Sequence, residues 1–156
     1  MNVERLHLRD YETAEELWSL QLAAYRVEAA AIGVADLPPL LDTIASLRGS
    51  GETFWGCRNE EGELVGAVSA KEAESVVTIC RVMVHPEYFR QGIGKRLLEH
   101  VLNLYADAGR FELSVERRNG PAIGLYRKLG FVPYGKIEPL PDISLVRMVK
   151  ERGKQP

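Results

Sequence analysis

The stretch Arg90-Gln91-Gly92-Ile93-Gly94-Lys95-Arg96 joins an apolar segment to a long amphipathic pattern. Two glycines at the start of a helix let a ligand approach the backbone closely. The first N–H groups of a helix have no internal partner and carry the positive end of its dipole, so they attract phosphate. Arg90, Lys95 and Arg96 add three cations at the same place. The stretch therefore predicts a site for a phosphorylated ligand.

Other glycine-rich motifs fit this stretch poorly. A dinucleotide fingerprint needs a third glycine at position 97, where the chain has Leu97. A P-loop needs four residues between its glycines and then Lys followed by Ser or Thr, which the stretch does not contain. The remaining alternative is a plain helix start, with two turn glycines and solvated basic side chains.

The segments on either side of this stretch predict a strand and a helix. Residues 76–84 are apolar on both faces and rich in β-branched side chains, which favours a central strand covered on both sides and ended by Pro86. Residues 92–108 place apolar side chains along one face, as in an amphipathic helix. Asn119 is then expected to cap a further helix that stops at Gly130.

The remaining elements follow from the spacing of apolar residues. A strand is expected over residues 3–9, and Asp10 can cap the helix after it. Pro38-Pro39 opens a short helix, with Leu40, Leu41, Ile44 and Leu47 expected to face inward. Further strands are expected over residues 53–58, 64–71, 111–116, 131–137 and 143–149. The order β-α-α-β-β-β-α-β-α-β-β predicts a mixed α/β fold in a single domain over residues 1–156.

Composition excludes several classes of function. The chain has 156 residues, of which 46% are hydrophobic and 27% charged, as in an ordinary globular protein. A formal net charge of −2 gives no electrostatic reason to expect nucleic-acid binding. No stretch approaches the 18 or so apolar residues of a membrane span, and the first residues lack the apolar core of a signal peptide. We therefore expect a cytoplasmic protein with no membrane association.

The cysteines and histidines give no sign of a metal site or of a disulfide framework. Cys57 and Cys80 each lie in an apolar run and are expected to be buried, reduced thiols. His7, His85 and His100 are too scattered to form a typical metal site. We expect no bound metal.

Two segments resemble the GNAT superfamily of acyl-CoA-dependent N-acyltransferases. Residues 82–98 (VMVHPEYFRQGIGKRLL) resemble its acetyl-CoA motif, R/Q-x-x-G-x-G/A, and residues 119–131 (NGPAIGLYRKLGF) resemble its N-x-x-A-x-x-x-Y-x-x-x-G-F motif. The order of elements agrees across nearly the whole chain. The resemblance implies a central sheet of about seven strands with helices on both faces, and acetyl-CoA as cosubstrate. The chain departs from the motif at Phe89, where the family usually has Arg or Gln, so Arg90 or Lys95 is left to assist binding.

The resemblance also implies where acetyl-CoA binds. The strand ending at Val84 should separate from the strand over residues 111–116, and the pantetheine arm should bond backbone groups between them. One N–H there can polarise the thioester carbonyl. The residues implied to bind the cosubstrate are Val82, Met83, Val84, Arg90, Gln91, Gly92, Ile93, Gly94, Lys95, Arg96, Asn119 and Tyr126.

Tyr126 is the catalytic residue that the resemblance implies. In the family this tyrosine reaches the CoA sulfur and donates a proton to the departing thiolate. Its position on the apolar face of a helix is equally compatible with core packing. Arg81 interrupts an apolar strand and needs a partner, which could be a structural carboxylate or a ligand.

The expected reaction is direct attack of an amine on the thioester in a ternary complex. The acceptor would be a small molecule or a peptide. The alternatives are a non-catalytic CoA-binding or sensing domain on the same fold, and transfer to a hydroxyl group or from a longer acyl donor. A homodimer is possible.

Acceptor binding is implied near the first two helices and residues 137–142, where Glu28, Asp36 and Asp142 could suit a cationic amine. For proton removal, the sequence predicts no indispensable carboxylate. The central strand over residues 76–84 contains no acid, and Ser114 stands where ribosomal-protein acetyltransferases carry a glutamate.

Three other acids are candidates for the base. Glu74 and Glu116 lie at strand ends, where hydration is the expected role, and Glu28 is the best candidate from outside the motifs.

Overall fold

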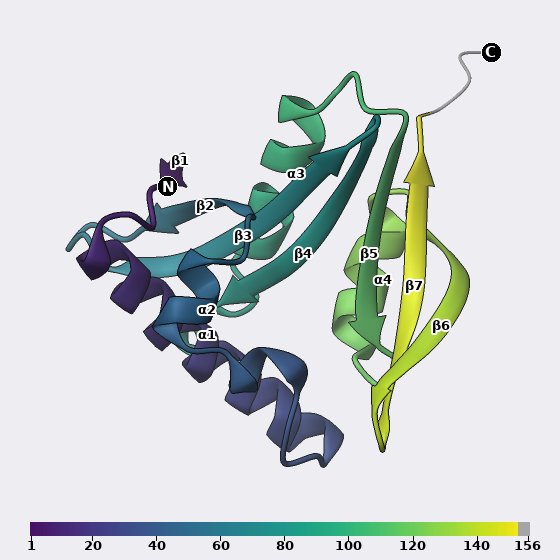
Figure 1. Cartoon of the computed structure of the whole chain (residues 1–156), viewed down its shortest axis with the longest axis horizontal. Coiled ribbons are helices and arrows are strands. Elements are labelled where there is room, and N and C mark those ends of the chain that lie inside the picture. The colour runs from purple at the N-terminus through teal and green to yellow at the C-terminus, as the bar shows by residue number, and fades with distance from the viewer. Residues whose placement is uncertain (153–156) are drawn as a thin grey trace.

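A mixed sheet with helices on both faces forms the molecule, as the computed structural model of residues 1–152 describes it (Figure 1). The strands are β1 (Val3–Leu6), β2 (Thr53–Arg58), β3 (Leu64–Ala73), β4 (Val76–Val84), β5 (Arg110–Glu116), β6 (Val132–Leu140) and β7 (Ile143–Glu151). The helices are α1 (Tyr11–Ile32), α2 (Ile44–Arg48), α3 (Ile93–Leu104) and α4 (Gly120–Lys128), with 3-10 helices η1 (Pro38–Leu41) and η2 (Pro86–Tyr88). The seven strands lie in the order β1-β2-β3-β4-β5-β7-β6. The predicted fold class is confirmed.

The core has a layer on each face of the sheet. On one face α3 and α4 pack over the central strands, with Leu97 and Val101 fully buried. On the other face α1 and α2 bury Leu17 and Leu47. Full burial of each such side chain contributes about 1.5–3 kcal/mol. Gly66 lets α3 approach closely, because a Cβ there would stand 2.7 Å from the Ile93 side chain.

The segment between α1 and β2 differs from the prediction. α1 continues to Ile32 and ends at Gly33, which has a left-handed φ of 78°. The single helix expected after Pro38 is divided, because Thr43 caps α2 in a reciprocal capping box with Ser46. Leu41, expected to face inward, ends η1 just before this break and is 62% exposed.

β4 and β5 stay together over only a short stretch. Their parallel pairing runs from Val76 opposite Arg110 to Thr78 opposite Glu112, whereas β7 pairs with β5 along its whole length. Beyond Thr78 the two strands diverge toward their carboxyl ends, as Figure 1 shows. The separation of these strands that the family resemblance implies is therefore present.

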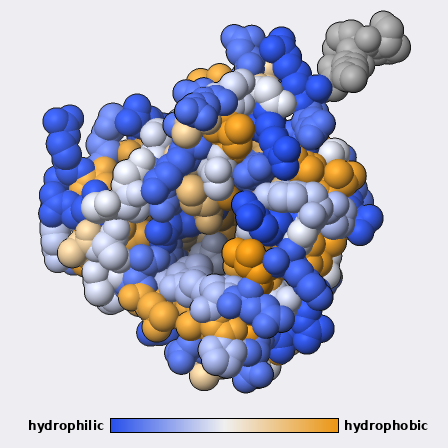
Figure 2. All heavy atoms as spheres, turned by 45° about the vertical axis from the view of Figure 1, so that its right-hand side comes forward, coloured by the Kyte–Doolittle hydropathy of each residue, from blue (hydrophilic) through white to orange (hydrophobic). Residues whose placement is uncertain are grey.

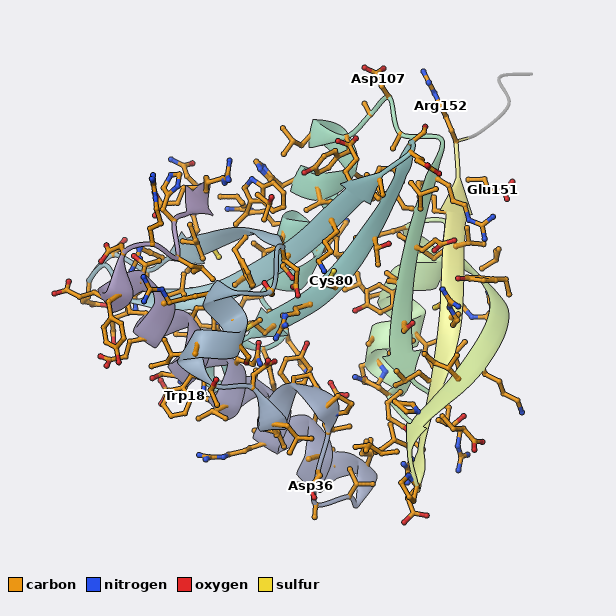
Figure 3. The ribbon with its side chains drawn as sticks, viewed as in Figure 1. Trp18, Asp36, Cys80, Asp107, Glu151 and Arg152 are labelled. Atoms are coloured by element: carbon orange, nitrogen blue, oxygen red, sulfur yellow. The ribbon has the colours of Figure 1, made fainter. Side chains whose placement is uncertain are left out.

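β4 is not covered on both faces, contrary to the prediction. Thr78 and Cys80 are exposed beside the divergence, and Figure 3 shows Cys80 on this strand. A bulge accounts for the position of Cys80, because Ser69 pairs with Arg81 and the next residue of β3 pairs with Ile79. The prediction of two buried thiols is wrong for Cys80 and confirmed for Cys57, and both thiols are free.

Arg81 connects the α1 layer to β4 through hydrogen bonds and salt bridges. Its guanidinium binds Glu52 in a bidentate pair at 2.9 and 3.0 Å, and it also binds Asp42 and the side-chain oxygen of Gln21. The structural salt bridge, one of the two alternatives for Arg81, is confirmed. This network holds α1 and the loop before α2 against the strand that borders the divergence.

Candidate active site

A cavity of about 890 Å³ lies where β4 and β5 diverge. Residues of α1, β4, the loop before α3, β5 and α4 line it, and Figure 2 shows a hollow in this face with hydrophobic residues at its margin. Gln91 and Arg96 are not among the lining residues. The sequence-predicted site residues that do line it are Val82, Met83, Val84, Arg90, Gly92, Ile93, Gly94, Lys95, Asn119 and Tyr126.

The loop before α3 presents unpaired backbone donors to the cavity. Arg90 and Gly92 have left-handed φ values of 63° and 77°, and Gly92 caps α3. The helical ladder begins with the Arg96 N–H bonding the Gly92 carbonyl, so the N–H groups between these residues precede it. Gly94 does not have a left-handed φ, and a Cβ there would meet only ordinary contacts at 3.7 and 3.8 Å. Gly92 thus provides the left-handed backbone conformation of the turn, whereas Gly94, having no side chain, leaves space beside the N–H groups at the start of α3.

Two of the three cations at this loop are available to a ligand. Arg90 and Lys95 are accessible at the cavity and form no salt bridge within residues 1–152. The Arg96 guanidinium instead donates to the main-chain carbonyl of Met1. Phe89, at the first motif position, has no polar group for a ligand. Arg90 and Lys95 therefore remain the two side chains that could assist binding in its place.

β4 has an open backbone edge along the cavity. The His85 N–H bonds the Val65 carbonyl of β3 at 2.8 Å, and successive residues of a strand direct their backbone groups to opposite sides. The groups of Val82 and Val84 therefore face the cavity, and the Val82 carbonyl accepts a hydrogen bond from the Tyr25 hydroxyl at 3.2 Å. Met83 faces β3, and its side chain is buried beneath α1.

Tyr126 combines a packed ring with a polar end at the cavity. Asn119 caps α4 by accepting from the Ala122 N–H at 3.2 Å, and the Tyr126 ring packs edge-on against Phe131 at 6.1 Å between centroids. Burial raises the pKa of the Tyr126 hydroxyl, and the charge of Glu28 raises it further. The hydroxyl is therefore protonated at neutral pH, and it has no hydrogen-bond partner among the described side chains and backbone.

Glu28 is a half-buried carboxylate of α1 at the other side of the cavity. Burial raises the pKa of Glu28, a hydrogen bond from the Asn119 side chain opposes this, and the charge of Glu116 raises it further. Asp36 and Asp142 do not line the cavity, and Figure 3 shows Asp36 at the far end of the α1 layer. Of the three acids that the sequence suggested for amine binding, only Glu28 is placed there.

Glu116 is buried and ion-paired, so the expectation that it is hydrated is wrong. It is 2% exposed, and its carboxylate accepts from the Arg118 Nε at 2.8 Å and from the Ser144 N–H at 3.0 Å. The Arg118 guanidinium also donates to the carbonyls of Ile32 and Asp142. It thus links the end of α1 to β5 and to the turn before β7. The sequence did not predict these contacts of Arg118. The one feature of the sequence that could have indicated them is the spacing of two residues between Glu116 and Arg118.

Replacing Glu116 with glutamine is expected to remove an acid-sensitive part of the stability. The Arg118 guanidinium and two backbone N–H groups lower the pKa of Glu116 from 4.5 to about 2. A carboxylate with a lowered folded-state pKa stabilises the fold above its unfolded pKa, and this stabilisation is lost as the pH falls from about 4.5 to about 2. After allowing for screening of the exposed Arg118, we expect roughly 2 kcal/mol.

Urea unfolding of both proteins at a series of pH values measures this difference. The gap in unfolding free energy between native protein and Glu116→Gln should be largest above pH 5 and should shrink toward pH 2. The same substitution at Glu99, exposed on α3, is the control. A gap that does not change with pH would contradict the assignment.

The described residues carry neither a membrane span nor a cluster typical of metal sites. No helix within residues 1–152 is both long and apolar enough to cross a bilayer. No three His, Cys, Asp or Glu side chains in that range are grouped so that they could hold a metal ion.

Comparison with known proteins matches the chain to one family. The model of the acetyltransferase (GNAT) family matches residues 6–131. The chain is 36% identical over 129 residues to UPF0157 protein YqkA of Bacillus subtilis, which covers 83% of this chain and 37% of that protein. It is 34% identical over 74 residues to the [ribosomal protein bS18]-alanine N-acetyltransferase of Escherichia coli, 46% of this chain and 50% of that protein. The chain therefore spans half or less of these relatives.

Solved structures share the fold over nearly the whole chain. The ribosomal-protein-S18-alanine N-acetyltransferase of Escherichia coli superposes with a TM-score of 0.76 at 20% identity, covering 99% of this chain and 96% of that one. The PaiA N-acetyltransferase of Thermoplasma acidophilum, in complex with coenzyme A, superposes with a TM-score of 0.71 at 22% identity, covering 97% and 99%. At these identities the likeness concerns the fold.

Proposed function

The chain belongs to the acetyltransferase (GNAT) family, and from this premise we propose that it transfers an acetyl group from acetyl-CoA to an amine of a small molecule or peptide. One observation carries the proposal. The cavity between β4 and β5 is lined by the unpaired N–H groups at the start of α3 and by the free cations Arg90 and Lys95, and also by Tyr126 and Glu28. An anionic donor and a cationic acceptor would thus bind in one cavity.

The cavity's residues suit acetyl-CoA. The pyrophosphate would lie against the N–H groups at the start of α3, with Arg90 and Lys95 beside it. The amide-bearing arm would bond the open edge of β4 at Val82 and Val84, as an added strand does. When bound, the cosubstrate supplies an activated thioester. The complex of the Thermoplasma acidophilum protein with coenzyme A supports such binding on this fold.

Each residue at the reacting end has a distinct part in the transfer. A backbone N–H of the open β4 edge would polarise the thioester carbonyl. Tyr126, protonated at neutral pH, would donate its proton toward the departing sulfur. Asn119 holds the first turn of α4 and so fixes the position of Tyr126 two turns later. The acceptor amine would attack directly, with both substrates bound.

The alternative is a CoA-binding or sensing domain without catalysis. A sensor needs neither a protonated hydroxyl without a partner nor a carboxylate beside it, and this cavity has both. The similarity to the bS18-alanine N-acetyltransferase of Escherichia coli supports transfer to an amine.

The test combines binding with turnover. Acetyl-CoA is expected to raise the melting temperature in a saturable way, by the equivalent of about 2.7 kcal/mol at one hundred times its Kd. A panel of primary amines is then assayed for release of the CoA thiol. Binding without release for any amine would favour the sensing domain, and absence of a thermal shift would refute the cosubstrate assignment.

A further inference from the structure

Three of the six charged side chains that line the cavity are already paired within residues 1–152. Arg81 is held by Glu52 and Asp42, and Arg118 is held by Glu116. Arg90 and Lys95 remain free, but they lie at the loop before α3. Glu28 is the one acid of the cavity lining that forms no salt bridge within residues 1–152. A carboxylate brought to a cavity without a cationic partner suits a cationic ligand.

Apolar side chains surround the Glu28 end of the cavity. They come from the end of α1, from the segment around η1, and from β7 across the opening. No second unpaired acid lines this end within the described chain, so a ligand with two cations would leave one of them desolvated and unpaired. The apolar residues are Ala31, Ile32, Leu37, Pro38, Pro39 and Leu145.

We propose that the α1 end of the cavity binds a primary amine that stands beside an apolar group, with Glu28 holding the ammonium and then taking its proton. This inference rests on the proposed acetyl transfer and specifies its acceptor. The sequence predicted no indispensable base and gave Glu28 only as the best candidate from outside the motifs, whereas the structure places Glu28 in the cavity lining.

The proposed step balances without any further reactant. The bond between the amine nitrogen and the acetyl carbon forms as the bond from that carbon to sulfur breaks. The ammonium first gives one proton to Glu28, which passes it to solvent, so that the neutral amine attacks. The nitrogen then loses a second proton to Glu28, Tyr126 gives one to the sulfur, and exchange with solvent restores both side chains. The net products are an N-acetylated amine, the CoA thiol and one proton released to solvent.

The electrostatics of the cavity couple these two proton transfers. Burial raises the pKa of both Tyr126 and Tyr25, and the charge of ionised Glu28 raises both further. A proton accepted by Glu28 removes that charge, so Tyr126 becomes a better acid as the thiolate departs. The groups that interact with Glu28 are Tyr25 on α1, Glu116 at the end of β5, and Asn119 and Tyr126 at α4. The basic side chains Arg81 on β4 and Arg118 after β5 line the same cavity.

Equilibrium binding tests the recognition of the amine without any turnover. The probes are leucine amide, glycine amide and putrescine, each titrated by calorimetry into protein saturated with CoA. Leucine amide should bind at least tenfold more tightly than the other two, because only its isobutyl group would be buried among the apolar residues at this part of the cavity. Glu28→Gln should weaken leucine amide binding at least tenfold, whereas Glu15→Gln, exposed on the same helix, should not.

The pH dependence of the rate tests proton transfer. With leucine amide, Glu28→Gln should lower kcat/KM by about 10²-fold, the low end for a lost acid–base group. Because the pKa of Glu28 is raised, the native profile should fall as Glu28 protonates, and this inflection should be missing in Glu28→Gln. Glu28→Asp, which keeps the carboxylate, should retain the inflection at a reduced rate. An unchanged CoA thermal shift in each variant shows that the fold and the donor site are intact.

Two outcomes separate this inference from the proposed function. If the native protein acetylates amines but Glu28→Gln changes neither amine binding nor the pH profile, Glu28 is not the group that binds the amine and takes its proton. If the native protein releases no CoA with any amine, the proposed function fails. The calorimetric comparison then still decides whether Glu28 binds amines, and equal affinities for the three probes would overturn the apolar acceptor class.

Discussion

Replacing Gly94 with valine is expected to abolish stabilisation by acetyl-CoA while the free protein stays folded. A Cβ at this position would meet only Leu125 and Val84 at ordinary distances, and the backbone is not left-handed, so the fold has room for the added Cβ. The branched side chain would instead hold the pyrophosphate away from the N–H groups of α3. Loss of two charge-assisted hydrogen bonds, at about 1.5–3 kcal/mol each, predicts a decrease of roughly 10³-fold in kcat/KM.

Thermal melts with and without acetyl-CoA, followed by steady-state kinetics, measure this effect. Gly124→Val is the matched control, because it adds the same side chain to α4 at a place with no neighbour within 4 Å. An acetyl-CoA affinity in Gly94→Val within a few-fold of the native value would mean that the phosphates bind elsewhere.

The second large effect is expected for Tyr126→Phe, which should lower kcat by about 10²-fold. The ring packs against Phe131, and phenylalanine preserves this contact, so the affinity for CoA should change by no more than a few-fold. Only the hydroxyl, protonated at neutral pH and without a partner in the described chain, is lost. The measurement is single-turnover kinetics with saturating acetyl-CoA and the best amine of the panel.

Tyr134→Phe is the control for removing a hydroxyl. Tyr134 is exposed on β6, where the guanidinium groups of Arg110 and Arg147 each lie over its ring. If Tyr126→Phe keeps the native kcat when chemistry limits turnover, the hydroxyl takes no part in the reaction and Tyr126 serves only in packing.

Local patterns predicted the elements whose boundaries are set by neighbouring residues. The bounds of β2 and β4 match the sequence prediction, because turn residues or proline flank clear apolar runs. Asp10 and Asn119 cap α1 and α4 as expected. The prediction was wrong around residues 29–48, where apolar spacing is loose. There, a side-chain contact between Thr43 and Ser46 decides that the chain breaks into η1 and α2.

The candidate site was only partly predictable for the same reason. The loop before α3 is one continuous stretch, residues 90–96, so its composition was enough to predict a site for a phosphorylated ligand. Glu28, by contrast, comes close to Tyr126 only through the packing of α1 and α4 around the divergence. The burial of Glu116 depends on Ser144 and Arg118. Pairings between residues far apart in sequence leave no periodic signal in a single chain.

The divergence of β4 from β5 leaves an exposed strand edge in the middle of a sheet, and such edges invite pairing with strands of other chains. Here the edge is recessed inside the cavity, and the Tyr25 hydroxyl covers the Val82 carbonyl. The Val82 carbonyl has two lone pairs, so a ligand N–H could bond it beside the Tyr25 hydroxyl. The recessed position of the edge thus restricts pairing to a narrow ligand that fits inside the cavity, and a strand of another chain is kept away from it.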